Sequence, residues 1–584
     1  MARTLLLKPL IGLLMLQNTL GTPVKRHISI YQDDDPSSFA PREPRLGAVA
    51  SSSEICSHIG TSLLKAGGNA ADAMVGTVAC VGVVAMYHSG IGGGGFMLVR
   101  SPNGTYEFID FRETAPAAAF ENMYKNNTEA SETGGLASGV PGELRGLHYL
   151  HEKYGVLPWE FVLKPAIKVA RNGWKVNADL VRYMASATNN GQDNFLVNDK
   201  QFAIDFAPQG RLLQLNETIT RKRLAKTLSI IAKEGPDAFY KGPIAEATIR
   251  ALQASNGTMT LADLANYTVA IRKPSTITYG DYKLTACSAP SGGGVALAAL
   301  KFMEGYPDIG DPSNINLTTH RLDESMRFAY AMRADLGDPS FVPGIEKFQE
   351  EMLSPATATA VRSKIFDNQT FPVAYYNPAG LESLETPGTS HVVTADKSGM
   401  AISLTTTVNL LFGSKLVVPE TGVIMNNEMN DFSIPNTTNA FGYVPSPSNF
   451  IRPGKRPLSS IAPVIVEHLK LDNMANALYI AIGAAGGSRI ITATIQNIVH
   501  MLNGNMTTAQ ALAQPRFHDQ LVPAQVSFEY AFDNKTTAFM QQLGANVTWM
   551  APGSSSAQGL RLLPNGTFEA AGEPRQLNSG GFAV

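Results

Sequence analysis

The chain has 584 residues, of which 47 are Lys or Arg and 49 are Asp or Glu, for a formal net charge of −2. Charged residues make up only 16% of the chain, so the broad basic surface of a DNA- or RNA-binding protein is excluded. The 44% hydrophobic content is that of a globular protein, and three cysteines are too few for a disulfide scaffold. At roughly 150 residues per domain, the length allows about four domains, or fewer if one is large.

The N-terminus has the layout of a secretory signal peptide over residues 1–22, and a charged, proline-rich lead-in follows over residues 23–45. The apolar part of the signal is too short to span about 30 Å of hydrocarbon, which disfavours a permanent anchor. We therefore expect a secreted, extracellular or vacuolar protein. Twelve Asn-x-Ser/Thr sequons support passage through a eukaryotic secretory pathway, and they begin at Asn103, Asn126, Asn216, Asn256, Asn266, Asn316, Asn368, Asn436, Asn505, Asn534, Asn546 and Asn565.

Two adjacent helices are predicted where the fold begins, near Leu46. Ser51 and Glu54 have the spacing of a capping box, and apolar residues then recur at helical spacing until Gly67 and Gly68 end the first helix. The second helix starts near Asn69. This pattern predicts a packed helical pair.

The three cysteines bear on this pair. Cys56 and Cys80 each lie in one of the two predicted helices and can form a disulfide in an oxidising compartment. Cys287 is left over.

An uncharged stretch, residues 73–99, is long enough to raise the question of a transmembrane helix. His88, Ser89 and the glycine run that follows would break a spanning helix. The pattern therefore favours a buried helix followed by a buried strand.

The glycine run also contains Gly90, Gly92 and Gly95 in a Gly-x-Gly-x-x-Gly pattern, with Asp110 further on. A dinucleotide-binding fingerprint needs a strand before the glycines and a helix after them, and here the order is reversed. Close backbone packing is the favoured interpretation. No metal-ligand spacing is present either, so the sequence assigns no metal and no cofactor.

Two hairpins are predicted. The first joins residues 96–100 to 106–111, and a mostly helical region over residues 141–334 follows it. The second has β-branched strands around a turn at 396–399. If Ala395 faces Met400, Thr389 lies opposite Thr406, within one residue of the hydroxyls of Thr405 and Thr407.

Here the chain resembles the γ-glutamyltransferase family (γ-glutamyl transpeptidase, glutathione hydrolase) of N-terminal nucleophile hydrolases. The matching segments occur in the family's order and spacing from about Gly47 to the C-terminus. They are FIDFRETAP around Arg112, TSH at Thr389, TTTVNLLFGS around Thr407 and Asn409, NNEMNDFS around Asp431, KRPLSS ending at Ser460, and GAAGGSRI at Gly486-Gly487.

The resemblance implies an α+β fold, an αββα sandwich made as one precursor and cut between Gly388 and Thr389. The large subunit would be residues 46–388 and the small subunit residues 389–584, and both would form one domain. A threonine hydroxyl is a weak nucleophile, but its own free α-amine, with an ordinary pKa of about 7.7–8.0, can accept its proton. Thr389 is therefore the expected nucleophile, and Thr407 would orient it.

A γ-glutamyl substrate carries an α-carboxylate and an α-ammonium on one carbon, so its pocket needs fixed charges of both signs. The resemblance implies that the carboxylate is bound by Arg112, Ser459 and Ser460. It implies that the ammonium group is bound by Asn409, Glu428 and Asp431. The backbone N–H groups of Gly486 and Gly487 would form the oxyanion hole.

Two features bear on acceptor choice. Glu428 matches animal-like members, whereas residues 435–453, with Tyr443, resemble the lid loop of bacterial members. The expected partners are glutathione, other γ-glutamyl compounds including glutathione adducts of a dedicated pathway, and amino acid or dipeptide acceptors. Three alternatives remain open: an amidase or acylase of the same fold, an unprocessed inactive homologue that acts as a binding protein, and a nicotinamide-dependent oxidoreductase.

Overall fold

The computed structural model describes residues 45–378, 388–435, 445–469 and 477–584. The chain divides into two units, residues 1–39 and 40–584, and all described residues belong to the second. The predicted signal peptide, nearly all of the lead-in, sequon Asn436 and Tyr443 lie outside the described residues. Among the described helices, none is both long and apolar enough to cross a membrane.

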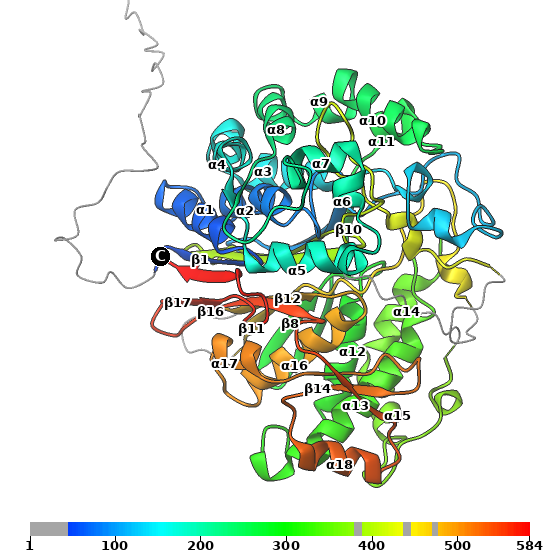
Figure 1. Ribbon diagram of the computed structural model, residues 1–584. Helices are drawn as coiled ribbons and strands as arrows, with labels where there is room; N and C mark the ends of the chain where they lie inside the picture. Colours follow the sequence, from blue (N-terminus) through cyan, green and yellow to red (C-terminus); the bar gives the residue numbers. More distant parts are fainter. Residues whose placement is uncertain (1–44, 379–387, 436–444, 470–476) are drawn as a thin grey trace, which may run out of the picture. The chain divides into compact units, whose positions relative to one another are not determined.

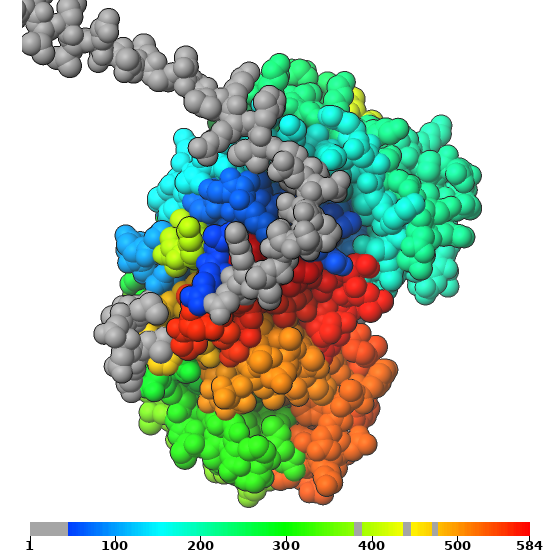
Figure 2. Space-filling view, turned by 90° about the vertical axis from the view of Figure 1, so that its left-hand side faces the viewer, coloured from blue at the N-terminus to red at the C-terminus, as the bar shows by residue number. Residues whose placement is uncertain are grey.

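Two antiparallel sheets form the centre of the fold (Figure 1). The first has seven strands in the order β18 (Gly580–Ala583), β1 (Gly47–Ser51), β9 (Gly388–Asp396), β10 (Ala401–Asn409), β2 (Gly94–Arg100), β3 (Tyr106–Asp110) and β6 (Ala270–Arg272). The second has six strands in the order β17 (Phe568–Ala571), β16 (Ser556–Leu562), β12 (Ala477–Ala485), β11 (Val464–His468), β8 (Tyr282–Ala286) and β7 (Ser275–Tyr279). Strands β1 and β18 pair with each other, so the blue start and the red end of the described chain lie side by side in Figure 2.

Helices cover the outer face of each sheet (Figure 1). The first sheet is covered by α1 (Glu54–Lys65), α2 (Ala70–Val84), α3 (Glu143–Tyr154), α4 (Trp159–Asn172) and α8 (Lys222–Glu234). The second is covered by α12 (Gly293–Met303), α13 (Ile315–Arg333), α16 (Arg489–Leu502) and α17 (Thr508–Ala513). This is the predicted αββα sandwich, which is confirmed.

The remaining elements lie around these layers. The other helices are α5 (Ala178–Ala187), α6 (Phe195–Asn198), α7 (Lys200–Phe206), α9 (Asp237–Tyr240), α10 (Gly242–Ala254), α11 (Leu261–Asn266), α14 (Ile345–Met352), α15 (Pro355–Arg362) and α18 (Asn534–Gln542). Two small sheets are built from β4 (Trp174–Lys175) with β5 (Thr218–Ile219), and from β13 (Phe517–His518), β14 (Val526–Glu529) and β15 (Val547–Met550). The expected helical region over 141–334 therefore also contains β4 to β8.

The alternation of side chains along β9 and β10 decides where their polar residues point. Val392 and Leu404 pack against the helices of the first layer, whereas Val393 and Ala401 pack between the two sheets. Successive side chains of a strand point to opposite faces, so the odd-numbered residues of both strands face the second sheet. Thr389 and Thr407 follow this parity.

The predicted helical pair is present, but its first cap differs from the prediction. Ser53, not Ser51, is the N-cap of α1, and the hydroxyl of Ser51 hydrogen-bonds to that of Ser57 at 2.7 Å. The expected capping box with Glu54 is wrong because β1 holds Ser51 in the sheet. Asn69 caps α2 with a capping box as the helix signal there predicts.

Two of the three cysteines and the glycine run lie in this layer. A disulfide joins Cys56 of α1 to Cys80 of α2, with the Cα atoms 5.3 Å apart, and Cys287 is buried and free. The glycine run connects buried α2 to buried β2 and packs closely on neighbouring backbone. A Cβ atom at Gly93 would lie 2.0 Å from the carbonyl oxygen of Thr407.

Candidate active site

Thr389 is the second residue of β9, and its side chain is buried between the sheets. Its hydroxyl oxygen lies 3.3 Å from that of Thr407, which donates to the carbonyl oxygen of Gly388 at 2.6 Å. Thr407 also accepts the N–H of Asn409 at 2.8 Å. A hydroxyl has one hydrogen and two lone pairs, so Thr389 must be the donor toward Thr407. The carbonyl of Gly388 therefore accepts a hydrogen bond from the same hydroxyl that accepts one from Thr389.

The strand register differs by one residue from the expected one. Thr389 pairs with Thr407 and not with Thr406. The N–H of Asp396 bonds to the carbonyl of Met400 at 3.0 Å, so the hairpin closes on a loop one residue shorter than assumed. A slip of one residue moves every side chain to the other face, and the tighter loop is what brings the two hydroxyls together.

The predicted oxyanion-hole residues follow β12 directly and precede α16. Gly486 and Gly487 have φ values of +124° and +61°. Residues that carry a Cβ atom rarely adopt this backbone conformation. A Cβ atom on Gly486 would lie 2.5 Å from the carbonyl oxygen of Ser554. Gly486 and Thr389 line one cavity of about 410 Å³, so the first residue of the predicted oxyanion hole and the predicted nucleophile border a common space.

Arg112 lies just beyond the end of β3, and its backbone N–H donates to the carboxylate of Asp110 at 3.0 Å. The guanidinium is fully buried and forms ion pairs with Glu428 through Nη1 and with Asp431 through Nη2. Arg112 and the two acids, separated by more than 300 residues in the chain, therefore form one cluster. We call these three residues the clamp.

Acidic groups outnumber the single cation at the clamp. Glu113 is also fully buried, and burial raises its pKa to about 8 despite the nearby guanidinium of Arg112. Burial likewise raises the pKa of Glu428 well above its usual value. Three carboxylates around one guanidinium leave a site that a proton or an ammonium group would stabilise.

Both carboxylate oxygens of Glu113 have no hydrogen-bond partner among the described residues. The same is true of two buried acceptors on the predicted ammonium-binding residues, Oδ1 of Asn409 and Oε2 of Glu428. The amide nitrogen of Asn409 donates to the carbonyl oxygen of Asn427 at 2.9 Å, which fixes the opposite orientation for Oδ1. A buried acceptor left unpaired costs free energy, so these two oxygens indicate the place of a missing donor.

Ser459 and Ser460 lie on a buried segment next to the clamp. The hydroxyl oxygen of Ser459 accepts a main-chain N–H two residues further on at 3.1 Å, and that of Ser460 accepts Nη2 of Arg333 at 3.2 Å. Nε of Arg112 reaches the carbonyl oxygen of Pro457 on the same segment at 3.4 Å. Since both serines act as acceptors here, each keeps its own hydrogen to donate.

A network of four charged residues supports the strand that carries Arg112. Arg272 pairs with Asp110 at 2.6 Å and with Asp338 at 2.9 Å, and Nε of Arg456 lies 3.2 Å from Asp110. Such a closed set of buried pairs holds Asp110, and through it the backbone of Arg112, in one position.

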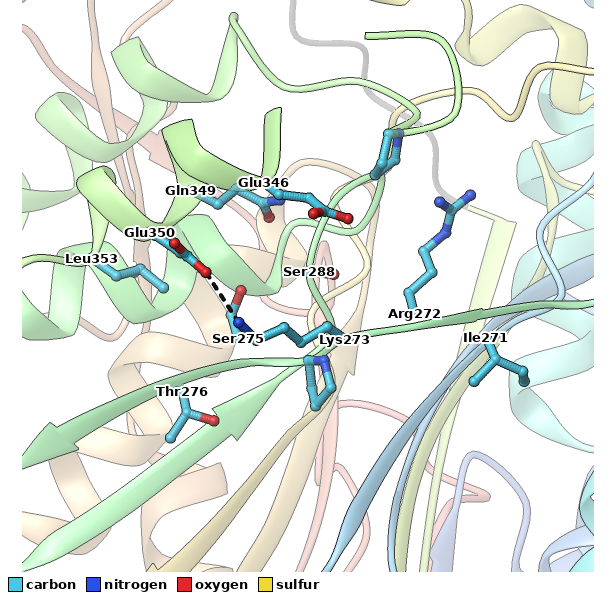
Figure 3. Close-up of a pocket in the computed structure, with 12 residues that line it drawn as sticks. Ile271, Arg272, Lys273, Ser275, Thr276, Ser288, Glu346, Gln349, Glu350 and Leu353 are labelled. Carbon is cyan, nitrogen blue, oxygen red and sulfur yellow. Dashed lines mark hydrogen bonds and ion pairs between the residues drawn. The ribbon is translucent and has the colours of Figure 1, made fainter. Parts of the chain in front are cut away.

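A second hollow of about 440 Å³ is lined by Arg272 of this network (Figure 3). Lys273 and Glu350 pair across one side of it at 3.0 Å, and Arg272 lies on the other side. None of its lining residues, all of them described, has a buried polar atom without a partner. It contains no predicted site residue, so the cavity beside Thr389 is the better candidate.

Two buried groups near the predicted site were not foreseen from the sequence. Glu113 directly follows Arg112 in the segment FIDFRETAP, and nothing in the sequence pattern indicates that it is buried. His88 lines the cavity of Thr389, with both ring nitrogens unpartnered among the described residues. The signal for His88 was a polar side chain in an otherwise apolar stretch, which was interpreted only as a helix breaker.

A threonine at the start of an inner strand of an αββα sandwich defines the class of the N-terminal nucleophile hydrolases. The particular family follows from comparison with known proteins. A family profile described as Gamma-glutamyltranspeptidase matches residues 56–582, and the chain belongs to that family.

The sequence similarity to known relatives extends over nearly the whole chain. The chain is 54% identical over 571 residues to the glutathione hydrolase proenzyme of Arthroderma benhamiae, covering 95% of each protein. It is 49% identical over 548 residues to the glutathione hydrolase of Aspergillus flavus, covering 94% of this chain and 91% of that protein. The solved cephalosporin acylase from Bacillus halodurans matches with a TM-score of 0.80 at 25% identity, covering 94% of this chain and 99% of that one.

Proposed function

We propose that the chain is a glutathione hydrolase and γ-glutamyltransferase that matures by self-cleavage before Thr389. The observation that carries the proposal is the hydroxyl of Thr389 beside the carbonyl of Gly388, which Thr407 polarises at 2.6 Å. The family membership and the glutathione hydrolase relatives support it.

Maturation follows from this geometry. The hydroxyl oxygen of Thr389 attacks the carbonyl carbon of Gly388, the C–N bond breaks, and the nitrogen takes up the proton lost by the hydroxyl. Water then hydrolyses the resulting ester. The products are a large subunit ending at Gly388 and a small subunit, residues 389–584, with a free α-amine on Thr389.

The clamp supports recognition of the γ-glutamyl group. Arg112 binds the α-carboxylate, with the hydroxyls of Ser459 and Ser460 as further donors. The α-ammonium group provides the donors that Asn409 and Glu428 lack and binds Asp431 as well. In the free protein Arg112 pairs with the same acids, so substrate exchanges internal ion pairs for its own two charges.

Turnover uses the amine that maturation releases. This amine accepts the proton of the Thr389 hydroxyl as the oxygen attacks the γ-carbonyl, since α-amines ordinarily have a pKa of about 7.7–8.0. The N–H groups of Gly486 and Gly487 stabilise the oxyanion, and the leaving amine takes the proton away. Water, or the amine of an amino acid or dipeptide, then releases the γ-glutamyl group from the threonine ester.

We assign the enzyme to the secretory pathway, as a secreted or vacuolar protein, on the N-terminal segment and the sequons. Of the eleven sequon asparagines within the described residues, ten are exposed, which leaves them accessible to a glycosyltransferase. Digestion with an amidase that removes N-linked glycans should lower the apparent mass of protein secreted by a eukaryotic host. An unchanged mass would contradict this assignment.

Denaturing electrophoresis together with a glutathione assay tests the proposal. Wild-type protein should run as two fragments and release glutamate, whereas Thr389→Ala should stay as one chain without activity. Thr389→Ser keeps a hydroxyl and should retain both steps at a lower rate. Two normal fragments with retained activity from Thr389→Ala would overturn the nucleophile assignment.

A further inference from the structure

The cavity beside Thr389 differs in charge from the clamp. Arg182 of α5 is the only charged side chain among the described residues that line it, and neither Asp nor Glu lines it. Its volume of about 410 Å³ falls within the range of about 300–1,000 Å³ that is typical of small-molecule sites. A cavity of this size with a single cation is suited to a small anion.

Arg182 is held in place but keeps hydrogens to donate. Nη2 donates to the hydroxyl of Tyr183 at 2.9 Å and lies 3.2 Å from Asp179, and Nη1 donates to the carbonyl oxygen of Arg575 at 3.1 Å. The guanidinium also stacks on the ring of Tyr183 at 4.6 Å. A guanidinium has five N–H groups, so these contacts leave Nε–H and one hydrogen of Nη1.

One loop connects this cation with the reacting centre. Ser554 packs on Gly486, where a Cβ atom would lie 2.5 Å from the serine carbonyl oxygen. The preceding residue, Gly553, packs on Arg182, where a Cβ atom would lie 3.2 Å from Nη1. Neighbouring Cα atoms are about 3.8 Å apart, so one loop positions both the predicted oxyanion hole and the cation.

His88 provides an independent sign of a polar ligand. Its side chain is 2% exposed and lines the cavity, and its ring packs edge-on against Tyr183 at 4.3 Å. Burial, together with the charge of Arg182, lowers its pKa to about 3, so the ring is neutral at physiological pH. Both ring nitrogens are buried and have no partner among the described residues, so a polar group that enters beside the ring would satisfy a donor and an acceptor of the neutral imidazole.

We propose that this cavity binds the amine half of the reaction and that Arg182 binds the carboxylate of that amine. The inference rests on the proposed function and deepens it. Glutathione without its γ-glutamyl group is a dipeptide that ends in a carboxylate, and amino acid or dipeptide acceptors also carry one. Because an extended dipeptide spans about 7 Å, its carboxylate lies away from Thr389 in the cavity that Arg182 also lines, and a free N–H of the guanidinium can donate a charge-assisted hydrogen bond to it. The enzyme therefore selects leaving groups and acceptors that are anionic.

Three donors with the same γ-glutamyl group test this assignment. They are glutathione, glutathione with its glycine carboxylate converted to an amide, and a γ-glutamyl anilide with a neutral leaving group. For the wild-type enzyme, we expect a KM about tenfold lower for glutathione than for its amide, since Arg182 is partly exposed and the charged contact is weakened by solvent. Arg182→Gln should remove this difference and leave the KM of the amide and of the anilide unchanged.

Two controls accompany the variant. Arg171→Gln removes an exposed arginine on α4 that bonds to Ser229 outside the cavity, and it should change no KM. Each variant is first checked for cleavage into two fragments. Arg182→Lys should give an intermediate preference because it keeps the charge but loses the planar group that stacks on Tyr183. Equal KM values for glutathione and its amide in the wild type, or an equal rise for all three donors in Arg182→Gln, would overturn the assignment. If the wild-type enzyme cleaves none of the donors, the proposed function fails as well.

Discussion

The two halves of the candidate site are built on opposite principles. The clamp is buried, dense in charge and already paired within itself. The cavity of Arg182 is open and is lined by this one cation and by no Asp or Glu, although Arg182 pairs with Asp179 of its own helix. A buried charge must be paired and hydrogen-bonded. The clamp therefore accepts only a ligand that carries both a positive and a negative charge and so replaces the internal ion pairs. The open cavity requires only that the ligand carry a negative charge. We infer that the enzyme is strict for the γ-glutamyl group and more tolerant of the amine.

The largest effect is expected at the centre of the clamp. Arg112→Lys keeps the charge but loses the planar fork, and hydrogen bonds to charged groups contribute about 1.5–3 kcal/mol. The KM for a γ-glutamyl donor should rise about 10- to 100-fold with kcat little changed, because the contact is present in both ground and transition states. Steady-state kinetics measure this split. A fall in kcat at constant KM would show that Arg112 acts on the transition state instead.

A smaller effect is expected on the acidic side of the clamp. Asp431→Asn removes one charge that meets the α-ammonium, so the KM of a γ-glutamyl donor should rise about tenfold. For a donor that lacks the α-amino group, the KM should change little. The quantity to measure is the ratio of the KM values of the two donors. Equal losses for both donors would mean that Asp431 supports Arg112 without binding the amine.

Thr407 should contribute less than the clamp. Thr407→Ala removes the hydrogen bond to the Gly388 carbonyl, which is worth about 0.5–1.5 kcal/mol, so self-cleavage should slow about 2- to 12-fold. Thr407→Ser keeps the hydroxyl and should cleave at nearly the normal rate. The matched control is Thr406→Ser, whose hydroxyl bonds to Glu143 on the other face of the sheet. Equal slowing in Thr406→Ser would contradict the observed register.

The two halves should also respond to pH with opposite sign. Burial raises the pKa of Glu113 in the folded protein from 4.5 to about 8, so its contribution to stability is complete below pH 4.5 and is lost as pH rises through 8. Burial lowers the pKa of His88 from 6.5 to about 3, so its contribution is complete above pH 6.5 and is lost as pH falls toward 3. For each group, the free energy of unfolding changes by at most about 1.4 kcal/mol per pH unit.

Unfolding midpoints in the uncleaved Thr389→Ala background measure these slopes without interference from processing. Glu113→Gln should flatten the alkaline side of the stability profile, and His88→Phe should flatten the acid side while keeping a ring against Tyr183. Profiles that keep their shape in both variants would show that neither group titrates on unfolding as its burial demands.

Much of the fold was predictable because its signals are local. The helix at Asn69, the glycine run before β2 and the threonine-rich strand follow from spacing and residue type. The register of Thr389 was not predictable, since it depends on how tightly the hairpin turn closes. Strands β6 to β8 were hidden because their short segments gain their order from the sheets and not from propensity.

The parts of the site also differed in how far they could be foreseen. Arg112 and Asp431 were recognisable from motifs, but their pairing in the free protein needs coordinates. His88 and Arg182 were missed as site residues because their proximity to Thr389 arises from packing between distant segments. No local pattern in the chain records that packing.

The most direct measurement of the central claim is the mass of the N-terminal peptide of the small subunit after incubation with a γ-glutamyl donor and rapid quenching in acid. The account predicts a peptide that begins at Thr389 and carries one γ-glutamyl group as an ester on its hydroxyl. A small subunit that begins elsewhere, or a γ-glutamyl group on a different residue, would contradict it.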